Sequence, residues 1–369
     1  MKIPAHEAEA GTAAVQLSED PGGIGPDSPG PSARQLALSE LRQHLTDWIS
    51  HEPGARRGRD AEELHQLRVA VRRIDATLGV FKHQIPVPLS HARKTAKGVL
   101  RGLGAARDFD VQLAELRHYC ADLPAEERAA AAPLKARLEE GRLRARTRML
   151  GMLDSEATRH WLETLNLASA DFAATAAPDA PQATAVMPQR VRARFRKLKK
   201  AVGRLDAESP LADFHAVRRR AKQLRYAIEC GSSLFGKPAE EMLKALRRLQ
   251  NELGAHQDAD MSKSRLAELA ASGADLPPAT LFLMGRIAEH QVAETRQAHK
   301  TLERVWGKVS GRRWKTLRTR MQELSAPAPS EASASTTGPA VKPGTHPQPS
   351  PEPEDALQPP ASAPRPLRH

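Results

Sequence analysis

Two segments of the chain place a histidine in front of a row of cations at helical spacing. The first, HQLRVAVRRIDATLGVF, contains His65, Arg68, Arg72 and Arg73. The second, HAVRRRAKQLRYAIECGSSLF, contains His215, Arg218, Arg219, Lys222 and Arg225. Arginine carries forked N–H donors that match the oxygens of a phosphate group two at a time. Rows of such residues are suited to binding a linear polyanion.

Helical geometry predicts that each segment presents its cations on one face. Each residue of an α-helix turns by about 100°, so the four cations named in the second segment fall within about 80° of His215. Arg68 and Arg72 hold the corresponding angles from His65, with Arg73 about 80° away. Like charges spaced four residues apart repel, and acids are nearly absent from these faces. A single basic face is usually only solvated, but the same layout occurring twice favours a binding surface.

The two histidines allow two kinds of chemistry. An imidazole among arginines can act as a hydrogen-bonding ligand to phosphate. It can also act as a nucleophile that accepts a phosphoryl group. The crowd of arginines favours the ligand role, and the nucleophile stays open as the alternative.

The elements that position these residues are predicted to be helices. Leu, Ala, Arg and Glu are abundant and favour helix. Around the first segment, Leu67, Val71, Ile74, Leu78 and Phe81 follow the spacing of one apolar helix face. The predicted helices span 34–50, 60–82, 89–102, 109–121, 124–150 and 155–167, then 189–205, 211–235, 238–252, 259–272, 277–306 and 311–324.

A shift of 150 residues superimposes the second half of the chain on the first. His65 then falls on His215, Arg68 on Arg218, and Leu103-Gly104 on Leu253-Gly254. An internal repeat of this length predicts two antiparallel helical bundles related by approximate twofold symmetry. Repeat boundaries are expected at 34–167 and 190–325, with a linker at 168–189.

The two Leu-Gly pairs are expected to end helices. Gly104 and Gly254 have the character of helix C-caps, and Asp108 and Asp258 would then cap the following helices or pair with a nearby arginine. The alternative is a metal seat, shared with Asp110 or Asp260, that bridges Mg²⁺ to phosphate.

Composition sets the remaining limits. The net charge of the 369-residue chain is +12, and both ends are net acidic, so the helical body is more basic than the whole. Residues 1–33 and 326–369 are rich in Gly, Pro, Ala and Ser and are expected to be disordered. Cys120 and Cys230 are far apart and predict buried, inert thiols in a cytoplasmic protein. We expect neither a secretory signal nor a membrane span.

The ordered motifs resemble the CHAD domain, the conserved histidine α-helical domain. The resemblance rests on His65-x-x-Arg68 with Arg72-Arg73, on Leu103-Gly104 with Arg107-Asp108, and on their repetition from His215 onward. It implies an all-α fold of two pseudo-symmetric antiparallel four-helix bundles and inorganic polyphosphate as the ligand. The residues carried over by the resemblance are His65, Arg68, Arg72, Arg73, His215, Arg218, Lys222 and Arg225; Arg219 and Lys97 complete the candidate set.

This chain departs from the family pattern in places. Asp75 stands where the second half has Arg225, Gln223 stands opposite Arg73, and Gln257 replaces Arg107. The two halves are therefore not expected to grip a ligand equally.

Three classes of function remain to be compared. The first is a binding module for polyphosphate, which needs cations and no catalytic group, cofactor or metal. Such a module could also coat polyphosphate storage granules. A nucleic-acid-binding protein would also use phosphate contacts, but single-strand binders stack bases on aromatics, and only 4% of this chain is aromatic. A phosphohydrolase of the CYTH type carries an ExExK motif, which is missing here. The sequence favours the non-enzymatic binder and leaves the oligomeric state open.

Overall fold

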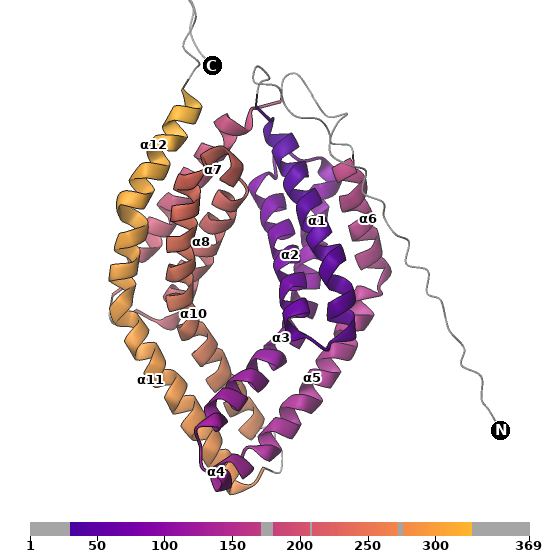
Figure 1. Ribbon diagram of the computed structural model, residues 1–369, viewed down its shortest axis with the longest axis vertical. Helices are drawn as coiled ribbons and strands as arrows, with labels where there is room; N and C mark the ends of the chain where they lie inside the picture. Colours follow the sequence, from indigo (N-terminus) through magenta and orange to yellow (C-terminus); the bar gives the residue numbers. More distant parts are fainter. Residues whose placement is uncertain (1–29, 171–179, 207–208, 272–275, 327–369) are drawn as a thin grey trace, which may run out of the picture. The chain divides into compact units, whose positions relative to one another are not determined.

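The chain is all helical in the parts that the structure describes. A computed structural model describes residues 30–170, 180–206, 209–271 and 276–326 (Figure 1). Within these ranges there is no β-strand beyond one isolated bridge between Ser32 and Gln182. The predicted all-α class is confirmed. The expected disordered ends lie almost wholly outside the described residues, as do residues 171–179 of the expected linker.

The helices fall into two matching sets. The first contains α1 (Ala33–Arg57), α2 (Ala61–Val80), α3 (Val87–Ala121), α4 (Ala125–Ala129), α5 (Ala132–Leu153) and α6 (Glu156–Ala170). The second contains α7 (Ala183–Val202), α8 (Leu211–Glu229), α9 (Ser232–Phe235), α10 (Lys237–Ala271), α11 (Pro278–Lys308) and α12 (Trp314–Ser325), with a kink at Gly311 in the segment Val309–Arg313 between the last two. Helices α3 and α10 both contain 35 residues, and their bounds differ by the repeat shift at both ends.

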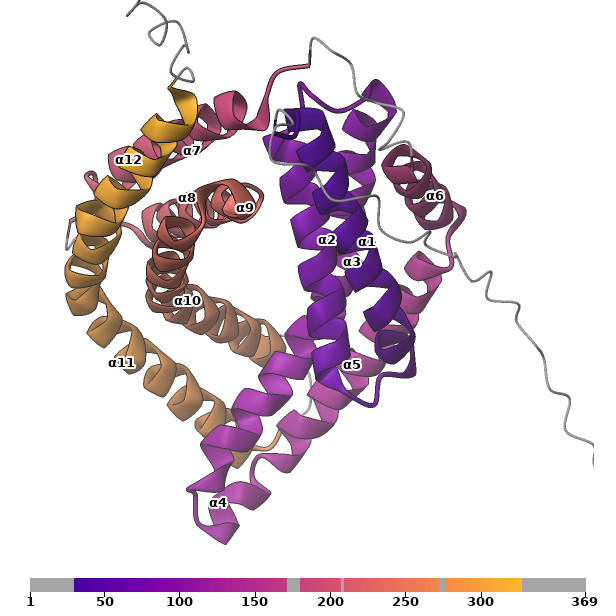
Figure 2. The same cartoon turned by 45° about the horizontal axis from the view of Figure 1, so that its top comes forward.

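Each set forms a four-helix bundle from which a helical hairpin extends. Helices α1, α2, α3 and α6 contact one another in the first bundle, and α7, α8, α10 and α12 do so in the second. The far ends of α3 and α10 leave the bundles and pair with α5 and α11 (Figures 1 and 2). The two predicted bundles are therefore present.

Local sequence explains where the first helices begin and end. Ser32 and Gln35 form a capping box at the start of α1. Gly58 ends the helix with φ of +66°, a conformation that glycine adopts without the strain of a side chain. The Asp60 carboxylate accepts a hydrogen bond of 2.8 Å from the backbone N–H of Glu62 and caps α2. These caps fix the start of the helix that carries His65.

The bundles meet through a shared core and a reciprocal backbone contact. One apolar cluster runs through both bundles without interruption and includes Leu67 and Ile74 of α2 and Leu224 of α8. Where α1 and α7 begin, the N–H of Ala33 donates to the Pro181 carbonyl at 2.8 Å, and the N–H of Ala183 donates to the Pro31 carbonyl at 3.0 Å. The contact is thus the same in both directions.

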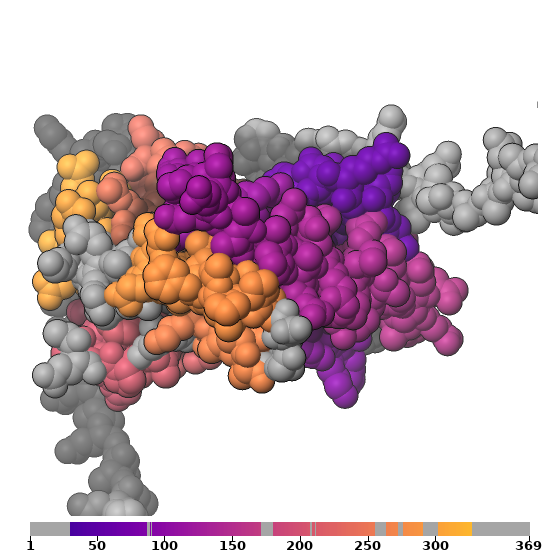
Figure 3. Space-filling view, turned by 90° about the horizontal axis from the view of Figure 1, so that it is seen from below, coloured from indigo at the N-terminus to yellow at the C-terminus, as the bar shows by residue number. Residues whose placement is uncertain are grey.

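A second apolar core joins the ends of the two hairpins. Leu134 and Leu138 of α5 pack with Leu283 and Ile287 of α11, and Leu116 of α3 belongs to the same cluster. Seen from below, α11 lies against the α4–α5 segment (Figure 3). This second core holds the extended parts of α3 and α10 near each other.

The expected helix ends at Gly104 and Gly254 are wrong. Helix α3 continues through Gly104 and α10 continues through Gly254, so Asp108 and Asp258 lie inside helices and not at the start of a following helix. Both glycines are buried and face an arginine of a neighbouring helix. The smallness of glycine serves tertiary packing here and does not terminate a helix.

Candidate anion-binding site

The two helices with the histidine and cation pattern are neighbours. Helix α2 contacts α8 across the two bundles. Near their C-terminal ends, Oγ1 of Thr77 lies 3.5 Å from Sγ of Cys230. Leu67, Val71 and Ile74 are fully buried on the core side of α2, as their spacing predicted. The half-buried His65 and Arg68 lie on another side of the same helix.

His65 sits among three arginines of the first bundle. Burial lowers the pKa of His65, and the nearby charges of Arg107, Arg72 and Arg68 lower it further, against the opposite effect of Glu62. Arg107 comes from α3, and its Nη1 donates a hydrogen bond of 3.4 Å to the Ala61 carbonyl at the start of α2. Burial and the neighbouring arginines therefore both favour the neutral form of the imidazole.

The guanidinium of Arg68 packs against α3 at Gly104, and we call this packing position the seat of the arginine. A methyl group added at Gly104 would lie 3.0 Å from Nη1 of Arg68, a close contact that would require the guanidinium to shift by a few tenths of an ångström. Asp108, one turn along α3, has its Oδ1 at 3.7 Å from the same Nη1. Burial and the charge of Arg72 lower the pKa of Arg68. The side chain is thus fixed against α3 while lying among like charges.

The second bundle repeats this seat. A methyl group at Gly254 would lie 3.3 Å from Nη2 of Arg218, and Nη1 of Arg218 donates a hydrogen bond of 3.1 Å to the Gly254 carbonyl. One turn before Arg218, His215 is half-buried. Its Nε2 is buried and has no hydrogen-bond partner among the described residues. The side chain of Asp258, the counterpart of Asp108, lies outside the described residues.

The remaining cations of α8 differ in exposure. Arg225 forms an ion pair of 3.1 Å with Glu229, and its guanidinium carbon lies 4.7 Å from the centre of the Tyr226 ring. Lys222 is half-buried and Arg219 is exposed. Arg225 is therefore partly neutralised within its own helix.

Two other candidates lie apart from the His65 cluster. Arg73 faces α1, where its Nη1 is 3.6 Å from the Asp47 carboxylate. It lines a small pocket between the bundles that also includes Glu40 and Tyr226. Burial raises the pKa of Glu40 to about 7, and the charge of Arg73 opposes that shift. Lys97 is exposed, and helical geometry places it two turns from Gly104 on the same face of α3.

The acidic side chains beside the site form ion pairs with some of the cations and not with others. Asp108 accepts a hydrogen bond of 2.7 Å from Nη2 of Arg265, which comes from α10, in addition to its contact with Arg68. Arg72 and Arg107 form no ion pair with any residue that the structure describes. These two side chains leave the first-bundle cluster with uncompensated positive charge, which is the condition for anion binding.

Two arginines of the site, Arg107 and Arg265, were not among the candidates predicted from the sequence. Arg107 was assigned to a break between helices, and Arg265 to a helix with no pattern of cations. The motif Arg107-Asp108 did contain the signal, because on a continuous helix Arg107 follows Gly104 by three residues and shares its side. Among the described residues, no three His, Cys, Asp or Glu side chains gather to hold a metal ion, and no helix has the length and apolar character to cross a membrane.

The fold and the site define a class of protein: an all-α chain of two repeated bundles with matched histidines and seated arginines on facing helices. The chain belongs to the CHAD domain family, whose model matches residues 39–267. No curated protein sequence matches it.

Two solved structures share the fold. The CHAD domain from the plant Ricinus communis has a TM-score of 0.63 and 24% identity, covering 78% of this chain and 94% of that one. PptA from Streptomyces chartreusis has a TM-score of 0.58 and 22% identity, covering 75% of this chain and 99% of that one.

Proposed function

We propose that this protein binds inorganic polyphosphate through the cations of α2, α3 and α8, and that it does so without catalysis. The observation that carries the proposal is the His65 cluster, where Arg72 and Arg107 have no acidic partner among the described residues. Membership of the CHAD family supports the same ligand. A polymer of phosphate offers closely spaced charges along a line, as the rows of cations on the two helices require.

Nucleic acid is the competing ligand, and the site favours it less. Single-strand binders stack bases on aromatic side chains. Tyr226 lies near the clustered cations, and the guanidinium of Arg225 already lies over its ring. The described part of the site thus offers phosphate contacts and little for a base to stack on.

Competition between polymers tests the function. Long-chain polyphosphate should displace labelled polyphosphate from the protein far better than DNA or RNA of equal phosphate content. By analogy with DNA, each neutralised phosphate should add roughly 0.7–0.9 to the slope of log affinity against log salt. The polymer should be recovered intact after incubation with Mg²⁺. Equal displacement by nucleic acid would contradict the ligand, and steady release of orthophosphate would contradict the absence of catalysis.

Polyphosphate affinity should rise about three- to tenfold as the pH falls from 8 to 6. In the free protein, burial and neighbouring arginines lower the pKa of His65. A bound polyanion favours the imidazolium, so the pKa of His65 is higher in the complex and binding takes up a proton. This added affinity is present below the pKa of the complex and is lost as the pH rises through it.

Titrations of the double variant His65→Ala with His215→Ala measure this effect. The variant should keep its helices by circular dichroism and lose most of the pH dependence. His160→Ala, which alters an exposed histidine of α6, is the matched control. A folded double variant with unchanged pH dependence would show that the histidines do not contact the ligand.

A further inference from the structure

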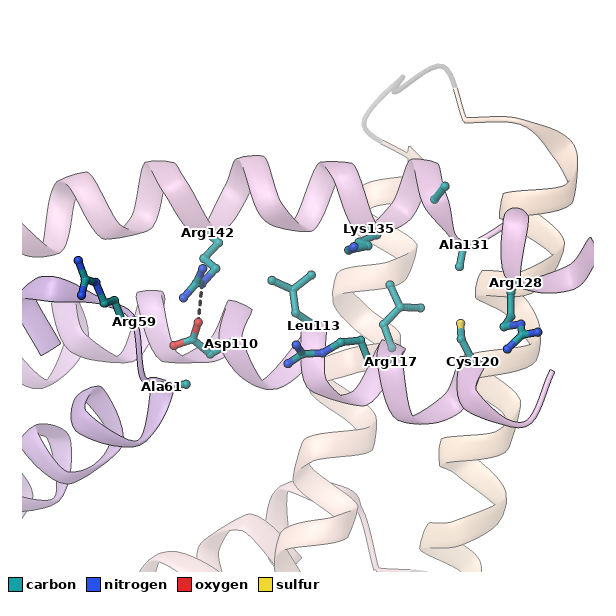
Figure 4. A pocket seen from close by; sticks show the side chains of 13 residues that line it. Arg59, Ala61, Asp110, Leu113, Arg117, Cys120, Arg128, Ala131, Lys135 and Arg142 are labelled. Carbon is teal, nitrogen blue, oxygen red and sulfur yellow. Dashed lines mark hydrogen bonds and ion pairs between the residues drawn. The ribbon is translucent and has the colours of Figure 1, made fainter. Parts of the chain in front are cut away.

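A second basic pocket lies between α3 and α5, and the proposed function does not use it. It measures about 470 Å³ and opens between the two helices and the loop that follows α1 (Figure 4). Its floor is apolar and includes Leu113, Leu116 and Ala131. Its rim carries five cations, which are Arg59, Arg117, Arg128, Lys135 and Arg142.

Most of these cations are not neutralised. Asp110 is the acid that lines the pocket; its side chain is 7% exposed and pairs with Arg142 at 2.6 Å. Lys135 pairs with Glu139 at 3.7 Å. The other three rim arginines are exposed and form no ion pair within the described ranges. The pocket therefore carries net positive charge over an apolar floor.

The pocket lies on a different side of α3 from the proposed polyphosphate site. Asp108 faces Arg265 of α10. Each residue of a helix turns by about 100°, so Asp110, Leu113 and Arg117 point between about 140° and 200° away from Asp108. The two surfaces are thus separated by the helix itself.

The pocket is also not part of the repeat. The shift of 150 residues that matches the two histidine helices places Ser209 opposite Arg59 and Ala267 opposite Arg117. The seats of Arg68 and Arg218, in contrast, occur in both bundles. The cationic rim of the pocket is therefore not repeated in the sequence of the second half.

We propose that this pocket binds a small organic polyphosphate of the nucleoside di- or triphosphate class. Ligand pockets of about 300–1,000 Å³ are lined mainly by apolar groups with a few polar groups that fix orientation. The base and sugar would cover Leu113, Leu116 and Ala131, and arginine planes can stack on a base. The phosphates would reach the unpaired rim arginines. An inorganic phosphate chain would leave the apolar floor without a partner.

Cys120 provides a reporter for the occupant, because it lines the pocket. It is half-buried, so the sequence-based expectation of a buried thiol is wrong for Cys120 and holds for Cys230. Burial raises the pKa of Cys120, so labelling is carried out at pH 8.5. The second thiol, Cys230, is buried, and burial raises its pKa to about 12, which keeps it unreactive. The rate of alkylation of Cys120 by N-ethylmaleimide, followed by peptide mass spectrometry, thus reports on this pocket and not on the polyphosphate site.

ATP and ADP should slow the alkylation of Cys120 at least fivefold at millimolar concentration. Adenosine lacks the phosphates and tripolyphosphate lacks the base and sugar, so each should slow the alkylation of Cys120 less than twofold. Equal protection by tripolyphosphate would overturn the proposal in favour of a plain phosphate site. Equal protection by adenosine, or no protection by any compound, would overturn it as well.

Variants separate this pocket from the polyphosphate site. Arg117→Ala with Arg128→Ala should abolish protection by ATP, with each variant compared with its own rate in the absence of nucleotide. Arg148→Ala removes an exposed cation of α5 outside the pocket and should leave protection unchanged. The double histidine variant should also retain protection. Loss of protection in the histidine variant but not in the rim variant would contradict the assignment to this pocket.

Discussion

Replacing Arg72 and Arg107 together by alanine should lower the affinity for polyphosphate about 100-fold. These two guanidinium groups lie beside His65 and have no ion pair among the described residues, so they are free to meet phosphate oxygens. A hydrogen bond to a charged group contributes about 1.5–3 kcal/mol, which is roughly tenfold or more for each arginine. The slope of log affinity against log salt should also become flatter by about two units. Equilibrium titration at several salt concentrations measures both effects.

A variant with the same change in net charge distinguishes binding at the His65 cluster from general attraction by the positive charge of the whole protein. Arg148→Ala with Arg318→Ala removes two exposed cations, one from each half, that lie away from the His65 cluster. Its affinity should fall less than threefold. If both double variants weakened binding equally, the net charge of the protein, and not the cluster, would be responsible.

Replacing Gly104 and Gly254 together by leucine should also lower the affinity about 100-fold. The atoms nearest to an added Cβ at these positions are the guanidinium groups of Arg68 and Arg218. The two leucine side chains would occupy the positions of the Arg68 and Arg218 guanidinium groups and displace both arginines. Leucine is a good helix former, whereas glycine in a helix interior costs about 0.8–1 kcal/mol relative to alanine. This gain in helix propensity offsets part of the packing cost at the two buried positions. Thermal unfolding measures the stability that remains, and titration of the folded variant measures the loss of binding.

A graded series makes the glycine experiment decisive. Alanine at both positions leaves room for a small displacement of the flexible arginines and should lower affinity only about threefold. Gly285→Leu in α11 is the control, since nothing lies within 4 Å of a Cβ added there. If the double leucine variant binds polyphosphate normally, the seated arginines are not ligands.

Periodicity in the sequence was sufficient to predict the all-α class and the two histidine helices, whereas the pair of four-helix bundles was implied by the resemblance to the CHAD domain. The apolar spacing of Leu67, Val71 and Ile74 placed the core side of α2, and the matched histidines revealed the repeat. Those features are local, because a helix face is determined by residues three and four apart. The stripes of cations followed from the same rule.

Features that depend on a second helix could not be predicted. Many helices end at a glycine, which is why the sequence suggests a C-cap at Gly104, whereas in the structure Gly104 leaves space for Arg68 of α2. The ion pair of Arg73 with Asp47 depends on how α1 packs against α2. The pocket between α3 and α5 gathers Arg59 and Arg142 from segments far apart in the chain. Contacts between residues of different helices depend on how the helices pack, and the spacing of residues along the sequence does not reveal that packing.

The reciprocal backbone contact between Ala33 and Pro181 and between Ala183 and Pro31 has an evolutionary meaning. A contact that reads the same in both directions is the mark of an isologous interface between two identical subunits. In a dimer of identical chains, every substitution occurs in both subunits at once. Here the two copies are one polypeptide, so each position can change alone. Covalent fusion thus lets one copy hold Arg107 where the other holds Gln257, and lets a pocket arise on one side while the shared interface stays intact.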